Sequence, residues 1–151
     1  MKIASVSSND WTLIERSSQN NIPKIISTGG RSIKDIDKIV SFFSQKNQNF
    51  SIMHCVSIYP TDAKDSELHN IKKLLTRYNN EVTIGWSTHE DPKNLFIGPL
   101  AYSLGARMFE KHIGIESKKY KLNKYSITPK LFEKYLQKMK ETKNIIGNEN
   151  E

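Results

Sequence analysis

Two histidines follow short apolar segments of this sequence and could bind a metal ion together. His89 ends the segment Val82-Thr-Ile-Gly-Trp-Ser-Thr-His89, and His112 ends the segment Ala106-Arg-Met-Phe-Glu-Lys-His112. The stretch between them is long enough for one crossover helix, which neighbouring parallel strands require. Because parallel strands end at one edge of a sheet, we expect the two imidazoles a few ångströms apart there. Imidazoles are ligands of divalent metals, and a pair of them leaves coordination positions open for a substrate.

Strand-like and helix-like segments alternate along the chain around these histidines. The patterns predict strands at 2–5, 23–29, 50–56, 82–85 and 107–112, and helices at 11–20, 32–45, 66–78 and 92–104. In the segment 32–45 apolar residues recur every three or four positions, which is typical of a helix with one buried face. Ser32 and Asp35 have the spacing of a capping box. The alternation predicts an α/β fold with parallel strands and crossover helices.

A last helix is predicted from Thr128-Pro129 to Gly147, which leaves 148–151 as a tail. The chain carries a net charge of +7, much of it on this helix and the loop before it. A solvated lysine stripe explains the charge better than a helix that binds nucleic acid, since no nucleic-acid motif accompanies it. The stripe consists of Lys130, Lys134 and Lys138, and the expected buried face consists of Leu131, Tyr135, Leu136 and Met139.

The single cysteine, Cys55, lies in an apolar strand and is expected to be a buried small side chain rather than a nucleophile or disulfide partner. No apolar run approaches the roughly 20 residues of a membrane span. The first residues lack the apolar core of a signal peptide. We therefore expect a cytoplasmic protein without a membrane partner.

Six segments carry a more specific signal, in this order: Lys2-Ile-Ala-Ser, Ile26-Ser-Thr-Gly, His54-Cys-Val-Ser-Ile-Tyr-Pro-Thr61, Gly85-Trp-Ser-Thr-His89, Glu110-Lys-His-Ile-Gly114 and Ser126-Ile-Thr-Pro129. Together they resemble the motifs of sialic acid (N-acetylneuraminate) synthases and of the related legionaminic and pseudaminic acid synthases. The resemblance covers nearly the whole chain. It implies that 1–147 is a partial TIM-type (β/α) barrel that matches the fourth to eighth strands, with the site at the strands' C-terminal ends.

The length of 151 residues provides about five βα units, whereas a complete barrel needs about 250 residues. Nothing in the sequence resembles the family's first three strands, which carry a glutamate and a lysine, or its C-terminal domain, which lends an arginine to the partner subunit's site. These differences favour a truncated or split gene product. We expect a protein partner or self-association to cover the open sheet edges.

The family condenses phosphoenolpyruvate with the open-chain aldehyde of an N-acetylated sugar, such as N-acetylmannosamine, and releases phosphate. By resemblance, His89 and His112 hold a divalent metal, typically manganese with magnesium or cobalt as alternatives, which polarises the aldehyde oxygen. The resemblance also assigns substrate contacts. Lys2, Ser5 and Ser87 match residues that contact the phosphate of phosphoenolpyruvate, and Tyr59 matches a tyrosine that lines the sugar site. Ser57 stands at a substrate-binding position where members of the family have serine or asparagine. His54 is expected near the site but on the opposite strand face from Cys55.

Three positions depart from the family pattern. Ser7 and Thr88 stand where acidic residues are usual, and Leu122 stands where an aspartate contacts the sugar. These side chains cannot replace a carboxylate in proton transfer or in hydrogen bonding to a sugar hydroxyl. Three hypotheses follow: a synthase with a different acceptor sugar, a catalytically inactive remnant with a binding or assembly role, and a protein that binds an acidic polymer through its basic C-terminal face.

Overall fold

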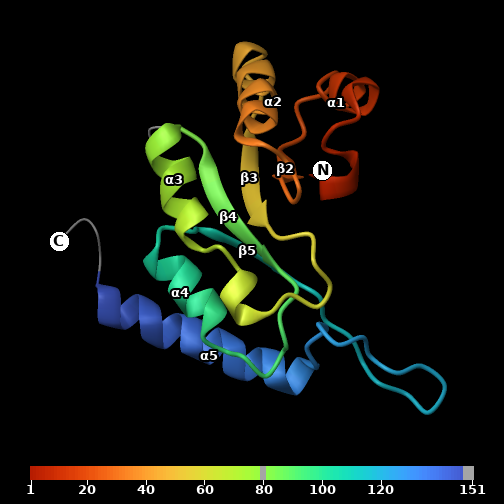
Figure 1. Ribbon diagram of the computed structural model, residues 1–151, viewed down its shortest axis with the longest axis vertical. Coiled ribbons are helices and arrows are strands. Elements are labelled where there is room, and N and C mark those ends of the chain that lie inside the picture. The colour runs from red at the N-terminus through yellow and green to blue at the C-terminus, as the bar shows by residue number, and fades with distance from the viewer. Residues whose placement is uncertain (79–80, 148–151) are drawn as a thin grey trace.

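A computed structural model describes residues 1–78 and 81–147 of the chain, and within them five parallel strands form one sheet (Figure 1). The strands lie side by side in chain order: β1 (Lys2–Ile3), β2 (Lys24–Ser27), β3 (Phe50–Cys55), β4 (Thr83–Thr88) and β5 (Met108–Lys111). The α-helices that connect or follow them are α1 (Trp11–Ser17), α2 (Ile33–Gln45), α3 (His69–Arg77), α4 (Ile97–Ser103) and α5 (Pro129–Ile146). Two 3-10 turns, Ser5–Ser7 and Ala63–Asp65, complete the elements. The predicted α/β class with parallel strands is confirmed.

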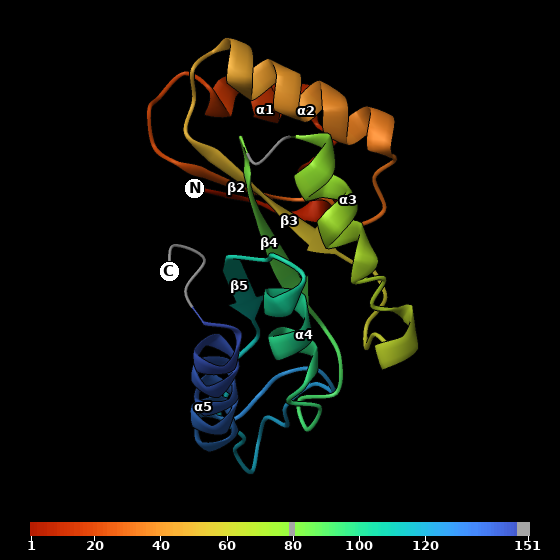
Figure 2. The same ribbon diagram turned by 90° about the vertical axis from the view of Figure 1, so that its left-hand side faces the viewer.

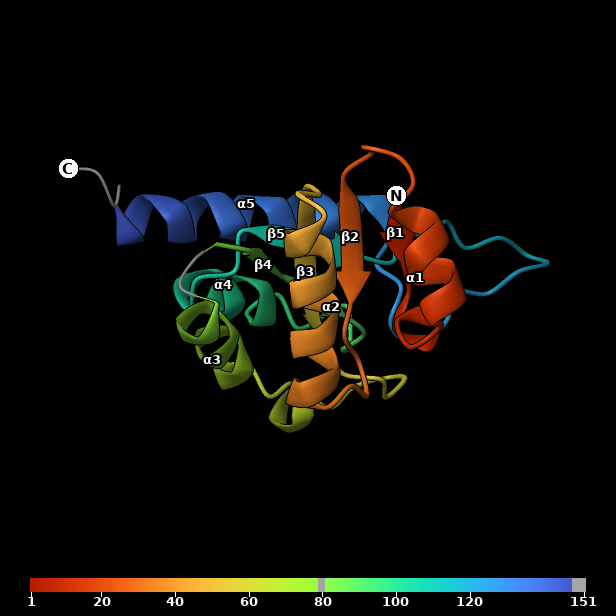
Figure 3. The same ribbon diagram turned by 90° about the horizontal axis from the view of Figure 1, so that it is seen from above.

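The sheet curls into a half-barrel, and the helices wrap around its outside. Figure 2 shows α1 and α2 beside β2, α3 and α4 beside β3 and β4, and α5 at the β5 end. Viewed from above, α1 lies next to β1 and β2 on one side of the molecule, and α5 runs along the back of the view behind β5 (Figure 3). Within the described residues β1 and β5 each pair with a neighbour on one side only, so both edges of the sheet are open. The partial TIM-type barrel predicted from the sequence is therefore the observed architecture.

Alternation along each strand separates the core from the concave face. In β4, Ile84 and Trp86 point outward and pack with Ile52 of β3 and with the apolar residues of α3 and α4. A second cluster joins β1 and β2 to α1 and α2 and contains Ile3, Ile14, Ile26, Ile39 and Phe43. The intervening side chains of the same strands are left for the inner face, where the candidate site residues lie.

Helix ends follow local hydrogen bonds more closely than hydrophobic periodicity. The Ser32–Asp35 capping box forms as predicted, and Thr128 caps α5, which ends at Gly147. The helix predicted from residue 92 begins only at Ile97, because Asp91 accepts the backbone N–H of Lys93 at 2.9 Å and holds a turn there.

Two other predictions need correction or fall outside the structure. Leu136, expected on the buried face of α5, is 42% exposed, because the helix packs mainly through Tyr135, which is buried as expected, with Leu131, Phe132 and Met139 partly buried around it. The lysine stripe of α5 is exposed as expected. The predicted tail 148–151 lies outside the described residues. Among the described helices, none is both long and apolar enough to cross a membrane.

A buried ion pair joins the ends of β4 and β5 on the outer face of the sheet. Lys111 Nζ donates to Glu90 Oε1 at 2.8 Å, and the side chains are only 3% and 2% exposed. The ammonium group also lies 5.4 Å from the ring centre of Tyr135 on α5. Tyr135 in turn packs so closely on Gly98 of α4 that a Cβ at Gly98 would lie 2.1 Å from its hydroxyl. The pair thus ties two strands to the helix layer behind them.

We expect Lys111→Met to destabilise the protein by about 3 to 5 kcal/mol, because it leaves the Glu90 carboxylate buried without a counter-ion. The double variant Lys111→Met/Glu90→Gln removes both charges and should lose much less. Lys138→Met is the matched control, since its ion pair with Glu141 is on the surface and should change stability by less than about 1 kcal/mol. Urea unfolding of the four proteins measures these differences, and equal losses for Lys111→Met and Lys138→Met would contradict the prediction.

Candidate functional site

The concave face of the sheet brings the two predicted metal ligands together. The ring centres of His89 and His112 are 5.2 Å apart, with an angle of 44° between the rings. Tyr59 lies 4.3 Å from His89 and Tyr125 lies 5.1 Å from His112, both measured between ring centres, and the two tyrosine rings contact one another at 5.7 Å. The two imidazoles therefore lie close together at one edge of the sheet, as the sequence predicts.

Backbone hydrogen bonds hold each histidine in place. Thr61 N donates to the carbonyl of His89 at 3.0 Å, which fastens the loop after β3 to the end of β4. Ile127 N donates to the carbonyl of His112 at 2.8 Å, which fastens the segment before α5 to the end of β5. The backbone at each histidine is therefore held by a segment distant in the sequence as well as by its own strand.

The imidazole pair fits a divalent metal ion at two coordination positions. Two rings that share an ion through bonds of about 2.1 Å have centres about 5 to 6 Å apart, as these rings do. His89 Nδ1 is buried, and within the described residues it has no hydrogen-bond partner. No third His, Cys, Asp or Glu of the described chain completes a metal-binding group with them. The remaining positions would fall to water or substrate.

Burial keeps the His89 imidazole neutral. Loss of solvation, together with the positive charge that His112 can carry, lowers the pKa of His89 to about 4. A neutral imidazole has the free lone pair that a metal requires, so His89 is ready to bind an ion at neutral pH without first losing a proton.

A charged cluster lies beside the histidines and includes a residue that the sequence did not single out. Glu110 accepts a hydrogen bond from Ser87 Oγ at 3.0 Å and forms an ion pair with Lys2. Although burial raises the pKa of this carboxyl, the hydrogen bond and charge of Lys2 outweigh it, and the pKa is lowered overall. Lys2 and Ser87, both predicted to contact phosphate, therefore share Glu110 as a partner.

The remaining predicted residues converge on Gly29, at the end of β2. Gly29 N donates to Ser5 Oγ at 3.0 Å. A Cβ at Gly29 would lie 2.3 Å from Ser57 Oγ and 2.8 Å from Ser5 Oγ, so only glycine leaves room for both hydroxyls. Cys55 is buried next to them, and this burial raises the pKa of its thiol. Cys55 is thus the buried, unpaired thiol that was expected.

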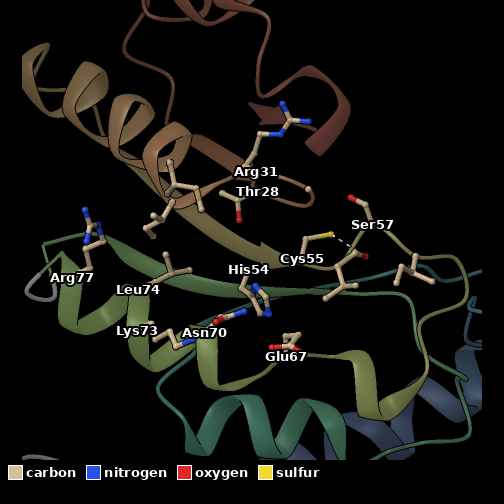
Figure 4. A pocket seen from close by; sticks show the side chains of 15 residues that line it. Thr28, Arg31, His54, Cys55, Ser57, Glu67, Asn70, Lys73, Leu74 and Arg77 are labelled. Atoms are coloured by element: carbon tan, nitrogen blue, oxygen red, sulfur yellow. Dashed lines mark hydrogen bonds between the residues drawn. The ribbon is translucent and has the colours of Figure 1, made fainter.

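Two cavities border this region. The smaller, about 350 Å³, is lined by residues of the site and of the adjoining loops: Ala4, Ser5, Val6, Gly29, Gly30, Arg31, Ser57 and Tyr59. The larger, about 840 Å³, lies between α2 and α3 on the helix side of the sheet (Figure 4). His54 points toward α3 in this view, and its Nε2 lies 3.1 Å from the carbonyl of Ser66. His54 is thus on the opposite face from Cys55, as expected, and away from the two metal candidates.

All seven predicted site residues, Lys2, Ser5, Ser57, Tyr59, Ser87, His89 and His112, therefore belong to one connected region of the concave face. The sequence missed the roles of Glu110 and Tyr125 in this region. Glu110 was visible within the Glu-Lys-His motif, and strand alternation placed it on the same face as His112. Tyr125 gave no such signal, since it reaches the site from an irregular loop.

The lowered pKa of His89 predicts that the protein loses stability in acid. Between about pH 6.5 and pH 4 the unfolded chain binds a proton at His89 that the folded chain does not, so the free energy of unfolding falls as the pH falls through this window. Between pH 7 and pH 4.5 we expect the free energy of unfolding to fall by about 2 to 3 kcal/mol less in His89→Gln than in the wild-type protein, since one pKa unit corresponds to about 1.4 kcal/mol. Urea unfolding at pH 7 and pH 4.5 measures it. An unchanged pH dependence in the variant would show that His89 is not buried as described.

The sequence of this chain is similar to those of a known protein family. The model of the NeuB family matches residues 1–151. N-acetylneuraminate-9-phosphate synthase of Drosophila melanogaster is 38% identical over 117 residues, which are 77% of this chain and 31% of that protein. Pseudaminic acid synthase of Campylobacter jejuni is 31% identical over 149 residues, 97% of this chain and 42% of that protein.

The crystal structure of N-acetylneuraminic acid synthetase from Leptospira borgpetersenii, in complex with citrate, superimposes with a TM-score of 0.89 at 32% identity. The superposition covers 98% of this chain and 51% of that one. The chain thus spans between about a third and a half of the length of these relatives. With the family match along its whole length, the half-barrel and the motifs gathered on its concave face, the chain belongs to the NeuB family.

Proposed function

We propose that this chain forms part of the site of a synthase that condenses phosphoenolpyruvate with an N-acetylated aldose, yielding a nonulosonic acid and phosphate. The observation that carries the proposal is the pair of facing imidazoles, 5.2 Å apart between ring centres, next to a cluster of hydroxyl and charged groups. The names of the relatives, which are sialic and pseudaminic acid synthases, support this class of reaction.

His89 and His112 would hold the divalent ion, for which manganese is the first candidate and magnesium or cobalt the alternatives. When bound, such an ion supplies Lewis-acid polarisation of the aldehyde oxygen. The neutral state of His89 suits this role, as does its unpartnered Nδ1.

The serines would bind the phosphate of phosphoenolpyruvate through their hydroxyl groups. Ser5 and Ser57 both lie close to Gly29, which has no Cβ to cover either hydroxyl group. Lys2 can take part without leaving Glu110, because an ammonium group has three donors. Glu110 would orient Lys2 and Ser87 toward the ligand, since both already donate to its carboxylate.

Tyr59 and Tyr125, whose ring centres are 5.7 Å apart, would form an aromatic wall of the acceptor site next to the histidines. Both rings pack against His89, with ring centres 4.3 and 5.6 Å away. Leu122 lies in the loop that leads to Tyr125 and contacts the backbone at Gly114. An apolar side chain there cannot bind a sugar hydroxyl. We therefore propose that the acceptor of this chain is less polar at this position than the acceptor of family members that have an aspartate there.

We also propose that another polypeptide segment or a second copy of the chain covers the open edges at β1 and β5, since exposed edges pair readily. The unpaired Cys55 agrees with a reducing compartment, and we propose that the protein works in the cytoplasm.

Substituting either site histidine tests the metal proposal. We expect His89→Ala and His112→Ala each to lower the affinity for Mn²⁺ at least tenfold in calorimetric titrations at pH 7, because each removes one of two protein ligands. His69→Ala is the matched control, since His69 is an exposed histidine of α3. Binding that is equally strong in both site variants would place the ion elsewhere.

We expect the chain alone to bind Mn²⁺ and phosphoenolpyruvate but to release no phosphate when N-acetylated hexoses are added. The reason is that its concave face is open to water along both sheet edges, and charge stabilisation is weak in a hydrated site. A phosphate-release assay with a panel of these sugars measures this. Metal-dependent release that disappears in His112→Ala would show that the described strands are sufficient for catalysis.

A further inference from the structure

Arg31 lies between the two cavities and lines both, and within the described residues no carboxylate is hydrogen-bonded to it. The residue follows the turn Gly29-Gly30 after β2, and its side chain extends away from α3 (Figure 4). The cavity wall it shares contains the hydroxyl groups of Ser5, Ser57 and Tyr59. Arg31 Nε is buried, and no residue of the described chain accepts a hydrogen bond from it.

Two other cations near this region, Lys2 and Arg77, differ in this respect. Lys2 is paired with Glu110. Arg77, across the larger cavity on α3, donates twice to Asp37, at 2.6 and 2.7 Å. The charge of Arg31 contributes, after the hydrogen bonds from Ser32, to the lowered pKa of Asp35, but the Asp35 carboxylate is hydrogen-bonded to Ser32 in the capping box of α2 and not to Arg31. Of these three cations, Arg31 is the one that is not paired with a carboxylate within the described residues. The cavity wall next to it carries hydroxyl groups instead.

A buried donor without an acceptor is costly, and a guanidinium group next to three hydroxyls is suited to an oxyanion. Its N–H groups can donate in parallel to two oxygens of a phosphate, while the hydroxyls donate to the others. The cavity volume of about 350 Å³ accommodates such a group with part of an attached molecule. The lack of a Cβ at Gly29 keeps the hydroxyls exposed to this space.

We propose that Arg31 binds the phosphate group of the substrate in this cavity, together with Ser5 and Ser57. The inference rests on the proposed function for the identity of the substrate, but the phosphate site itself rests on the cavity and on the unpartnered guanidinium group. Arg31 supplies a positive charge that is not shared with a carboxylate, in addition to the one that Lys2 can contribute while it stays paired with Glu110.

The test is a titration of the ¹⁵N-labelled chain with inorganic phosphate, with phosphoenolpyruvate and with pyruvate, followed by NMR. In the wild-type chain we expect phosphate and phosphoenolpyruvate to shift the Arg31 Nε–Hε signal and the amide signals of Gly29 and Gly30, whereas pyruvate, which lacks phosphate, leaves them unchanged. Arg31→Gln should weaken the binding of both phosphate compounds about tenfold to a hundredfold, the range expected for a charged hydrogen bond. Arg31→Lys keeps the charge but not the paired donors, so its affinity for the two phosphate compounds should lie between that of the wild-type chain and that of Arg31→Gln.

Arg16→Gln is the matched control, because it removes the same charge from the exposed face of α1 and should leave both affinities unchanged. Thermal unfolding of each variant confirms that the fold is retained. Equal phosphate affinity in the wild-type chain and in Arg31→Gln would overturn the inference, as would the absence of phosphate binding to the folded wild-type chain or shifts caused by pyruvate alone. These titrations contain no metal, so a failure of Mn²⁺ binding would count against the proposed synthase site and not against the phosphate site at Arg31.

Discussion

The pairing of β4 with β5 is the constraint on which the candidate site depends. His89 precedes Glu90, and His112 follows Lys111, so the imidazoles lie on one face of the strand ends while the ion pair lies on the other. A slip of β5 by one residue against β4 would turn His112 toward the helices and Lys111 toward the concave face, away from His89 and Glu90. The buried ion pair and the ring of Tyr135 behind it therefore favour the single register in which the histidines meet.

Charge is distributed over the concave face in two separate groups. Near the histidines, Lys2 and Glu110 neutralise one another and also engage Ser87. Near Gly29, Arg31 has hydroxyl groups around it and no acid in hydrogen-bonding contact within the described chain. The first group can orient donors without a large change in net charge, whereas the second attracts an anion. A substrate that carries both a phosphate and a reactive carbon could extend from one group to the other.

Much of this arrangement could be predicted from the sequence, because hydrophobic periodicity and strand-end chemistry are local signals. The parallel strands, the capping box at Ser32 and the meeting of His89 with His112 all follow from them. The exposure of Leu136 on α5 could not be predicted, since it depends on how Tyr135 fits against Gly98. Tyr125 and Arg31 were missed for a similar reason: each reaches the site from a loop, and loop side chains are placed by contacts with residues far away in the sequence.

The sheet order has a consequence for how the protein acquires its structure during synthesis. Every strand pairs with the strand next to it in the chain, so the half-barrel can be built progressively as the polypeptide leaves the ribosome, without waiting for a distant partner. The contact between Lys2 and Glu110 is the exception, because 108 positions separate the two residues. The hydrophobic layers can thus assemble early, and the charged centre of the concave face is completed only after the last strand has emerged.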